Sequence, residues 1–562
     1  MATKVLPPIE TWGVSAQGGK LLVNPSPSLL DRDTYALDVE TDERDNLVCL
    51  CLATDKDAYV FDTLTLELRK KLSDLKLVGH GIKADIKWLR MWGVPIKDSQ
   101  LVFDTMIGAY VLDSTKQKYG LKALASEMLD MHYPSYRQMV NGFGKGHTTL
   151  DMVDAAQVHN YNANDAIATY RIYQQLEPKL SEKQWDYLET LEAPTAQVLA
   201  EIESRGMLID VDKAHELAMK FGYEMTRIVS LIQEEAPSIK NVNSNAQVGK
   251  HLISLGMDLP QTKTGKAAVN KKALEKYRQV PLIKLLLRYS EVEKLKSTYT
   301  DVLLEKSPNP EARTYRLHAY FNQCATNTGR LSSSGPNLQN IPTRTDDGAL
   351  IRECFIAPPG SVLVDADYSQ IEPRIMAHYS QDPVMLQIFR DGEDLYDAIS
   401  KYVGCERAVA KILWLALAYN AGAYKIAEIA GISVNQAFRF LDKMKERFPA
   451  LFYWKDLTIK KAEKDGFILT LFGRRIELPP GQTSKGTNYV VQGSASEVMK
   501  LALIATSQYS PISTIHDEII FERPEGQECV SQITRAMTGV ITLSVPLVVK
   551  VGVGKSWAEA KA

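Results

Sequence analysis

Asp38 and Glu40 are carboxylates two positions apart in the short apolar run 36–41 (ALDVET). On a strand, side chains at i and i+2 point to the same face, whereas Val39 between them points to the core. Two carboxylates on one face repel each other unless a cation lies between them, and hard oxygen ligands suit Mg²⁺ or Mn²⁺. The spacing therefore favours a divalent-metal site, with the alternative that these acids only end a strand at a turn.

Two later segments supply residues that could complete this site. Asp85 ends the segment 79–85 (GHGIKAD) and stands at the opening of an apolar helical stretch. Tyr161 and Asp165 are four residues apart, so a phenol and a carboxylate share one helical face. These features strengthen the prediction of a metal site in the first third of the chain.

A second set of acids lies in the second half of the chain. Asp367 follows the apolar run 361–366 and precedes a helical pattern, which places it at the carboxyl end of a strand, a common position for a ligand-binding carboxylate. Asp517 and Glu518 stand at the tip of a tight hairpin predicted over residues 514–521. A fold that unites Asp367 with Asp517 creates a like-charge pair that needs a divalent metal. Seen alone, each acid also fits a structural role at a strand end or in a turn.

Arg407, Lys411 and Tyr419 recur at spacings of four and eight. On a helix such positions drift by about 40° per step, so they share one broad face. A cationic face suits an anionic ligand such as a phosphate, whose charge Lys and Arg neutralise. The alternative is an exposed helix stripe, but neighbours such as Leu413 and Leu417 are too apolar for full exposure.

The composition is that of an ordinary globular protein. The 562 residues predict three or four domains of about 150 residues. The net charge of −2 gives no global positive field, and 45% apolar with 24% charged residues excludes a largely disordered or collagen-like chain. The sequence has no run of 18 uncharged apolar residues and no signal-like core in residues 1–20, which predicts a cytoplasmic protein without a membrane span. Six scattered cysteines without a C-x-x-C pair predict reduced thiols.

The elements that must position these residues indicate an α/β and α+β multidomain fold. Apolar runs 35–39 and 47–53 around a charged turn predict a hairpin, and the first 180 residues alternate strand and helix patterns. Residues 185–304 predict long helices with interruptions near 241–246 and 262–269. Residues 262–299 hold ten Lys or Arg against three Glu, which fits either a solvated helix face or an arm that grips a phosphate backbone.

The first set of acids, in this order and with its tyrosine, resembles the proofreading 3′–5′ exonuclease domain of the DnaQ-like (DEDD) superfamily, whose fold is RNase H-like. The resemblance implies that two metal ions are bound and that Tyr161 orients the attacking water. The metal ligands it implies are Asp38, Glu40, Asp85 and Asp165. Asp104 is interpreted as structural, and Gly81 stands where the family has Asn, so a contact to the frayed strand is missing. The alternative is a domain retained only for its shape.

From about residue 190 onward the chain resembles family A DNA polymerases, the DNA polymerase I group. The motifs occur in the order of that family: TGRLSS at 328–333, PNLQNIP at 336–342, DYSQIE at 367–372, GRR at 473–475, VQG at 491–493 and HDE at 516–518. Chance assembly of this set in order is negligible. The resemblance therefore implies a right-hand polymerase of palm, fingers and thumb.

The resemblance also implies a role for each motif residue. Asp367, Asp517 and the backbone oxygen of Tyr368 would hold two Mg²⁺ ions, with Mn²⁺ as the alternative, and Glu518 would be a secondary acid. Arg407 and Lys411 would neutralise the leaving pyrophosphate. The residues that would contact the incoming nucleotide are Gln370, Glu372 (the steric gate against ribose), Leu415, Tyr419 and His516.

The DNA contacts implied by the resemblance lie in the same motifs and in the basic arm. They are Arg330, Asn337, Gln339, Asn340, Asn488 and Gln492, together with Lys294 and Lys296 of the basic arm, which now reads as part of the thumb. The chain departs from the family where Leu415 replaces an aromatic residue, Ser484 replaces Arg and Pro373 replaces Leu. The first departure leaves in question the packing of an aromatic ring against the nucleotide. The second leaves one DNA contact in question.

The domain borders predicted in this way are residues 1–185 for the exonuclease domain and 186–562 for the polymerase. Within the latter we expect the thumb near 195–325, the palm near 326–375 and 490–562, and the fingers near 376–489. This compact two-module layout is similar to that of phage replicative enzymes, which would place a viral member in the host cytoplasm. We expect primer–template DNA and dNTPs as partners of a monomer, with a helicase or a primase as further candidates.

Two rival interpretations remain beside DNA synthesis with proofreading. One is a nuclease with a degenerate polymerase half, motivated by Leu415 and Ser484, and the other is a primer–template binding scaffold without catalysis. Residues 554–556 (GKS) look like the end of a phosphate-binding loop. That reading is rejected because Val549 occupies the position of the required first glycine and no helix is expected afterwards.

Overall fold

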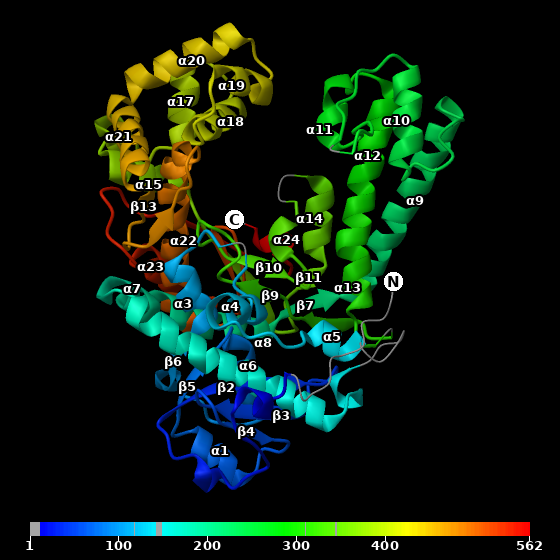
Figure 1. Ribbon diagram of the computed structural model, residues 1–562. Helices are drawn as coiled ribbons and strands as arrows, with labels where there is room; N and C mark the ends of the chain where they lie inside the picture. The colour runs from blue at the N-terminus through cyan, green and yellow to red at the C-terminus, as the bar shows by residue number, and fades with distance from the viewer. Residues whose placement is uncertain are drawn as a thin grey trace.

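The computed structural model describes residues 12–116, 118–141, 149–262, 264–309, 311–342 and 345–561. The first eleven residues of the segment in which no signal core is expected lie outside this range, as does Lys263 of the basic arm. The N-terminal domain, blue to cyan in Figure 1, lies below a second sheet, and two groups of helices rise on opposite sides of that sheet. The arrangement confirms the expected multidomain α/β fold.

A mixed sheet carries the N-terminal domain. In the described chain its strands are β1 (Leu21–Val23), β2 (Thr34–Thr41), β3 (Leu47–Ala53), β4 (Ala58–Phe61), β5 (Lys76–Gly79) and β6 (Leu101–Asp104). Their order is β1-β4-β3-β2-β5-β6, with β2 antiparallel to β3 and parallel to β5. The predicted hairpin of β2 and β3 is thereby confirmed.

Helices cover both faces of this sheet, and successive side chains along a strand point to alternate faces. Cys49 and Cys51 of β3 face one helix layer, whereas Leu50 and Leu52 face the other. The helices of the two layers are α1 (Leu66–Leu72), α2 (Lys83–Met91), α3 (Thr105–Leu112), α4 (Leu121–Leu129), α5 (Tyr136–Asn141) and α6 (Ala155–Leu176). The 22-residue α6 crosses β2 and β3, so it delivers side chains directly onto the face that carries Asp38.

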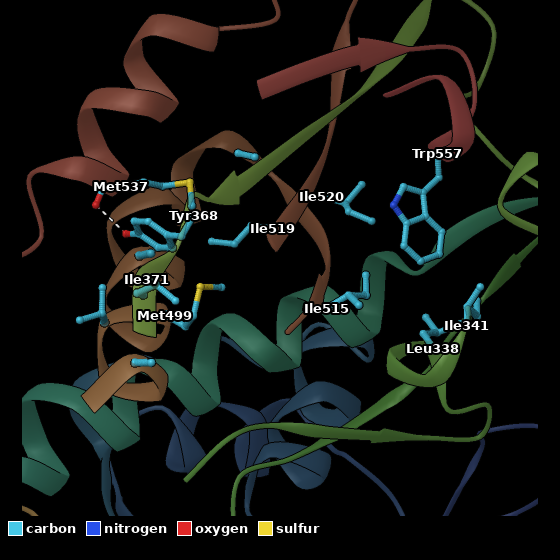
Figure 2. Packing of buried hydrophobic residues seen from close by; sticks show 14 of the residues in the cluster. Leu338, Ile341, Tyr368, Ile371, Met499, Ile515, Ile519, Ile520, Met537 and Trp557 are labelled. Carbon is cyan, nitrogen blue, oxygen red and sulfur yellow. Dashed lines mark hydrogen bonds between the residues drawn. The ribbon is translucent and has the colours of Figure 1, made fainter. Parts of the chain in front are cut away.

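The second sheet is antiparallel throughout the described chain. It consists of β12 (Ser361–Tyr368), β15 (Pro511–Ile515), β16 (Glu518–Pro524) and β17 (Val549–Gly554), in the order β15-β16-β12-β17. Helices α23 (Val530–Thr538) and α24 (Trp557–Ala560) contact its strands, and α15 (Ile371–Ser380) and α22 (Gly486–Thr506) contribute side chains to the same apolar core. Figure 2 shows the apolar core beneath this sheet, where the hydroxyl of Tyr368 donates a 2.6 Å hydrogen bond to the carbonyl of Met537.

Two helical groups flank the second sheet (Figure 1). The green group holds α9 (Val211–Glu235), α10 (Asn245–Ser254), α11 (Lys271–Leu274), α12 (Pro281–Leu295) and α13 (Asp301–Glu305). The opposite group holds α16 (Pro383–Arg390), α17 (Leu395–Val403), α18 (Arg407–Ala418), α19 (Ala423–Ala430), α20 (Val434–Arg447) and α21 (Pro449–Asp465). The basic arm thus falls on α11 and α12, on the segments before them and on residues 296–299 after α12.

The expectation of long helices over residues 185–304, interrupted near 241–246 and 262–269, was wrong at one further place. After α7 (Glu182–Tyr187) and α8 (Ala193–Arg205), a strand, β7 (Met207–Asp210), precedes α9. Gly206 ends α8 with a positive φ of 61°, and a Cβ at this position would lie 2.7 Å from the carbonyl oxygen of Leu317. The glycine therefore permits a sharp exit into β7.

The remaining short elements join the layers. β7 lies between β8 (Thr314–Leu317) and β11 (Phe355–Ile356), and the hairpins are β9 (Tyr320–Asn322) with β10 (Ser332–Ser334) and β13 (Phe467–Leu469) with β14 (Arg475–Glu477). Helix α14 (Asp346–Glu353) contacts α24. Short α24 also corrects the expectation that no helix follows the GKS tripeptide. No helix in the described part of the chain is long and apolar enough to cross a membrane.

Candidate active sites

The N-terminal acids meet where α6 crosses β2. Asp38, Glu40 and Asp165 each offer a carboxylate oxygen, and these oxygens lie within 4.8 Å of one another. Burial and then the charge of Asp165 raise the pKa of Asp38 to about 7, and burial and the charge of Asp38 raise the pKa of Glu40. Such crowding of carboxylates is relieved by a cation, so the predicted cluster is a candidate metal site.

Asp85 lies beside this cluster, on α2. Its Oδ1 accepts a 3.0 Å hydrogen bond from the backbone N–H of Val39, which fixes the start of α2 beside β2. The carboxyl group is buried, and its burial together with the charge of Asp38 raises its pKa. The structure thus brings the acids predicted for this site close to one another.

Lys122 of α4 is a member of this site that the sequence analysis missed. Its ammonium pairs with the carboxylate of Asp165 and lies 4.1 Å from the ring centroid of Tyr161 and 3.8 Å from that of Tyr133. Burial lowers the pKa of Lys122, whereas Asp165 opposes that change. Tyr161 itself is buried beside Asp165, one helical turn away on α6. The lysine is an internal counter-ion for the carboxylates.

Asn162 of α6 is a second missed residue. Its side-chain amide donates to the carbonyl oxygen of Asp38 at 3.1 Å and to Oδ2 of the same residue at 2.6 Å. It is fully buried and orients the carboxylate toward the cluster. Asn162 lies next to Tyr161 in the motif, so its position was the signal that could have found it.

Asp104 acts as a cap. Its carboxylate accepts from the backbone N–H groups of Gly81 at 3.0 Å, Ile82 at 2.9 Å and Met106 at 2.9 Å. These bonds satisfy the first turns of α2 and α3, in line with the predicted structural role. Gly81 has a positive φ of 67°, a conformation that glycine adopts without strain.

A buried ion pair joins the N-terminal domain to the rest of the chain. The ammonium of Lys83 on α2 pairs with Glu203 on α8 and donates to the carbonyl oxygen of Phe321 at 2.6 Å. A second buried pair, Lys500 of α22 with Glu192 just before α8 at 2.5 Å, lies on the C-terminal side of that joint. Because α2 also carries Asp85, the joint between the domains lies close to the N-terminal acids.

The acids of the second sheet meet across antiparallel strands. Asp367 on β12 stands directly opposite Glu518 on β16, and the N–H of Tyr368 donates to the carbonyl oxygen of Asp517 at 3.0 Å. Two segments 150 residues apart therefore lie side by side, as the sequence predicted. Burial raises the pKa of Asp517 to about 6, while the nearby guanidinium of Arg330 lowers it.

Two further charged residues belong to this cluster and were missed. Asp365 lies two residues before Asp367 on the same strand face and is fully buried. The ammonium of Lys561 lies 3.6 Å from Asp365 and 3.2 Å from Asp367, and it pairs with Glu518. Burial and the charge of Glu518 raise the pKa of Asp365. The i, i+2 spacing that identified Asp38 and Glu40 was a usable signal for Asp365, whereas Lys561 had none.

Glu372 is the centre of a hydrogen-bonded chain between the sheet and the flanking helices. It pairs with Arg330, and its Oε2 lies 3.1 Å from the hydroxyl of Tyr419. That hydroxyl also accepts from the amide of Gln492 at 3.1 Å. Residues of four separate predicted motifs are thus linked in one hydrogen-bonded chain through this carboxylate.

Helix α18 presents the predicted cationic face. Arg407 and Lys411 each lie 5.6 Å from the ring centroid of Tyr396 on α17. Arg407 also pairs with Asp394 at 2.6 Å, a carboxylate that accepts from the amide of Gln370 as well. Asp394 and Tyr396 were not predicted. Leu415 is half-buried on the same helix.

Trp414 lies elsewhere on α18, as the helical angle predicted. It is fully buried and packs edge-on against Phe448 with ring centroids 5.9 Å apart. It therefore does not replace the aromatic side chain that the family has where this chain has Leu415.

Three of the residues predicted to contact DNA or the incoming nucleotide gather beside Asp517. Arg330, Gln339 and His516 line one pocket together with Asp517. His516 adopts a positive φ of 54° in the hairpin turn.

Asn337 and Asn340 lie in the turn before α14, and each accepts a hydrogen bond that stabilises this turn or its contact with a neighbour. The carboxamide oxygen of Asn337 accepts from the N–H of Gln339 at 3.1 Å, and the carbonyl oxygen of Asn340 accepts from the hydroxyl of Tyr299. Tyr299 belongs to the turn that joins α12 to α13, so the flanking green helices are anchored to this motif.

The predicted DNA contacts farther from the acids are less uniform. Lys294 is exposed on α12, whereas the ammonium of Lys296 pairs with Asp301 at 2.7 Å. Asn488 is half-buried at the start of α22, and the backbone carbonyl of Ser484 accepts from Asn420 at 2.7 Å. Their contacts to DNA stay predictions.

The fold is that of a multidomain α/β protein with two acidic centres, one on each main sheet. A model described as DNA polymerase family A matches residues 211–559, and a model described as 3′-5′ exonuclease matches residues 25–181. The chain belongs to DNA polymerase family A, with a 3′–5′ exonuclease domain at the N-terminal side.

Known relatives agree with this assignment. The DNA polymerase I of Pseudomonas aeruginosa is 35% identical over 536 residues, which are 89% of this chain and 58% of that protein. The thermostable DNA polymerase I of Thermus filiformis is 37% identical over 431 residues, which are 71% of this chain and 51% of that protein. The chain thus spans about half the length of these curated relatives. Both are bacterial, so the phage-like layout stays a prediction.

A solved structure has the same fold along nearly the whole chain. The POL domain of Pol1 from M. smegmatis, in complex with a DNA primer-template and dNTP, is 27% identical with a TM-score of 0.83. The match covers 97% of this chain and 100% of that chain.

Proposed function

We propose that the chain is a template-directed DNA polymerase that extends a primer 3′ end and proofreads with a 3′–5′ exonuclease, for DNA replication. The observation that carries the proposal is the register that places Asp367 opposite Glu518 and next to the Asp517 backbone. Separated acids united at one edge of a sheet suit metal-dependent phosphoryl transfer.

The acids fit a pair of divalent ions in each domain, which we propose to be Mg²⁺ with Mn²⁺ as a substitute. In the N-terminal domain the support is the crowding of three carboxylate oxygens within 4.8 Å. In the palm, Asp367 and Asp517 would hold the ions together with the backbone oxygen of Tyr368. When bound, such ions activate the attacking oxygen and stabilise the charge that develops on the leaving oxygen.

The residues around the palm acids would handle the nucleotide. Arg407 and Lys411 would bind the triphosphate after Arg407 releases Asp394. Glu372 would close over the sugar and exclude a 2′ hydroxyl, held in place by Arg330 and Tyr419. Gln370, His516 and Leu415 would complete the nucleotide pocket.

In the N-terminal site, Asn162 would orient Asp38 and Tyr161 would position the attacking water. Asp85 and Asp165 would complete the ligand set together with Glu40. Lys122 would exchange its contact with Asp165 when ions bind, because the same carboxylate serves both.

For the DNA, we propose a path between the two helical groups. Lys294 and Lys296 would contact phosphates, which carry most of the affinity in such complexes. The side chains that would meet the template, the primer and the minor groove are Arg330, Asn337, Gln339, Asn340, Asn488 and Gln492.

We place the domain borders as the sequence suggests: exonuclease 1–185, thumb about 195–325, palm about 326–375 and 490–562, and fingers about 376–489. Helix α8 contacts α2, α22 and β15, so it belongs to the joint between the domains. We further propose a monomer that works in the cytoplasm, with a helicase or a primase as additional partners.

One assay separates this function from its rivals: extension of a labelled primer on a template, with and without dNTPs, in Mg²⁺. Wild type should extend with dNTPs and shorten the primer without them. Asp367→Ala or Asp517→Ala should abolish extension and keep shortening, whereas Asp38→Ala combined with Glu40→Ala should do the reverse.

Asp442→Ala, an exposed acid on α20, is the matched control and should behave as wild type in both halves. Shortening without any extension by wild type would favour the nuclease interpretation. Binding of the primer–template without turnover of either kind would favour the scaffold.

A further inference from the structure

Lys561 occupies the place of a cation among the palm carboxylates. Its ammonium lies 3.6 Å from Oδ2 of Asp365 and 3.2 Å from Oδ2 of Asp367, and it pairs with Oε2 of Glu518. Its side chain is 22% exposed, whereas those of Asp365 and Glu518 are 0% and 6% exposed. The contact therefore lies on the buried side of the cluster next to Asp365, which we call its deep side.

Asp365 is an additional acid that the proposed polymerase reaction does not use. In the described chain neither of its carboxylate oxygens has a hydrogen-bond partner, and Oε1 of Glu518 also has none. An ionised carboxylate buried without partners is expensive, so a nearby positive charge is required. These unpartnered oxygens point to a place where a cation is held.

A second cation is close but is engaged elsewhere. Arg352 of α14 attracts Glu518 and Asp365 electrostatically, but its Nη1 donates to the carbonyl oxygen of Pro342 at 2.6 Å. Lys561 is thus the described cation that forms ion pairs with all three acids of the cluster, Asp365, Asp367 and Glu518.

The position of Lys561 is set by well-packed structure. Ser556 caps the start of short α24, and its hydroxyl accepts from the N–H of Glu559 at 3.2 Å. Trp557 is fully buried, with its ring edge-on to Phe355 at 5.5 Å between centroids. Figure 2 shows Trp557 near Ile520 of β16, the strand that begins with Glu518. The lysine is therefore presented by a fixed element.

We propose that Lys561 is a positioning residue that keeps a divalent cation out of the deep side of the palm cluster. Without its ammonium, Asp365, Glu518 and Asp367 form an oxygen-lined site that Mn²⁺ or Mg²⁺ would enter. An ion held there would draw Asp367 away from Asp517, where the proposed reaction needs it. The inference rests on the proposed function for the role of Asp367, but the predicted ion binding is independent of catalysis.

Counting bound Mn²⁺ tests this inference. The full chain with Asp38→Ala and Glu40→Ala removes the N-terminal site, and free Mn²⁺ is measured by electron paramagnetic resonance during titration without DNA or nucleotide. In this background Lys561→Met should bind one more Mn²⁺ per chain than Lys561, and Lys561→Arg should not. Adding Asp365→Asn to Lys561→Met should remove the extra ion.

Primer extension supplies the second readout. Lys561→Met should lower kcat by about tenfold with little change in the KM for dNTP, and Asp365→Asn should restore part of it. The matched control is Lys555→Met, which removes a lysine from an exposed pair with Glu525 on the same segment and should leave both readouts unchanged.

An unchanged Mn²⁺ count in Lys561→Met, or an extra ion that survives Asp365→Asn, would overturn the inference. Failure of wild type to extend primers would instead overturn the proposed function. The Mn²⁺ count would then still decide whether Lys561 excludes an ion. The two failures are thus distinguishable.

Discussion

The hydroxyl of Tyr419 lies 3.1 Å from Oε2 of Glu372, and this contact ties the end of α18 to the first turn of α15. Arg330 holds the other oxygen of the same carboxylate. Glu372 is only 8% exposed, so its direction is set by these two partners. A movement of α18 would therefore shift the carboxylate of Glu372, which is proposed to exclude ribose.

Tyr419→Phe should loosen that carboxylate without leaving a cavity. A hydrogen bond to a charged group is worth about 1.5–3 kcal/mol, so we expect the KM for dNTP to rise about tenfold. Incorporation of ribonucleotides should increase at the same time. Steady-state kinetics with single dNTPs and rNTPs measure both effects.

Tyr424→Phe is the control for this change, since Tyr424 is 74% exposed on the neighbouring α19. It should alter ribonucleotide discrimination by less than Tyr419→Phe. Equal discrimination in wild type and Tyr419→Phe would mean that the hydrogen bond does not position Glu372.

Asp38→Asn should change the pH dependence of stability in the metal-free protein. Burial and Asp165 raise the pKa of Asp38 from 3.8 to about 7, so the stability present below pH 3.8 is lost as the pH rises to about 7. The Asn variant lacks this loss, so its advantage in Tm over wild type should grow between pH 4 and 7 and then level off. Thermal melts in EDTA at pH 4.5, 6 and 8 measure it.

Added Mg²⁺ should reverse this ranking at pH 8, because only the wild-type carboxylate can bind the ion. Asp31→Asn, an exposed acid just before β2, should show neither effect. A Tm difference between Asp38→Asn and wild type that is constant with pH would contradict the predicted titration of Asp38.

The acids of both sites could be predicted because local sequence patterns position them. Asp38 and Glu40 follow from the period of a strand, and Asp517 follows from a hairpin whose two strands are contiguous in sequence. The meeting of Asp367 with that hairpin required the family resemblance, since no local rule determines which distant strands pair.

The lysines of the two clusters could not be predicted in this way. Lys122 and Lys561 lie outside any motif, and only tertiary packing brings α4 and α24 to the acids. A single lysine is more often exposed to solvent, so the sequence alone does not indicate that its ammonium has a buried partner. Strand β7 was not predicted for a related reason. Its four residues, between two helices, are too few to show a clear alternation of apolar and polar side chains.

Lys122→Met should destabilise the metal-free N-terminal domain, because the acids lose their internal counter-ion. The Tm in EDTA should fall, and saturating Mg²⁺ should recover more of it than in wild type, since the ions then supply the missing charge. Primer shortening should drop while extension with dNTPs is unchanged. Melting curves and the labelled-primer assay measure these effects.

Lys118→Met provides the comparison, because Lys118 is exposed three residues before α4. It should match wild type in both assays. If Lys122→Met melted as wild type in EDTA, the ion pair with Asp165 would have no part in balancing the cluster.

Lys83→Met should weaken the joint between the exonuclease domain and the polymerase part of the chain. The side chains of Lys83 and Glu203 are 5% and 4% exposed, and removing one partner of such a pair leaves a buried charge at a cost of about 3–5 kcal/mol. The urea concentration at the midpoint of the first unfolding transition should therefore fall. Lys425→Met, which breaks an exposed pair with Glu428, should cost less than about 1 kcal/mol.

Glu203→Gln should then rescue Lys83→Met in part. The amide oxygen of Gln can still accept the 2.7 Å hydrogen bond from the N–H of Phe321, while the buried negative charge disappears. The carbonyl oxygen of Phe321, which accepts from Lys83 in wild type, stays without that donor, so recovery should be incomplete. Additive losses in the double variant would mean that Lys83 and Glu203 act independently. Partial recovery would show that the lysine mainly offsets the glutamate beneath the helix that carries Asp85.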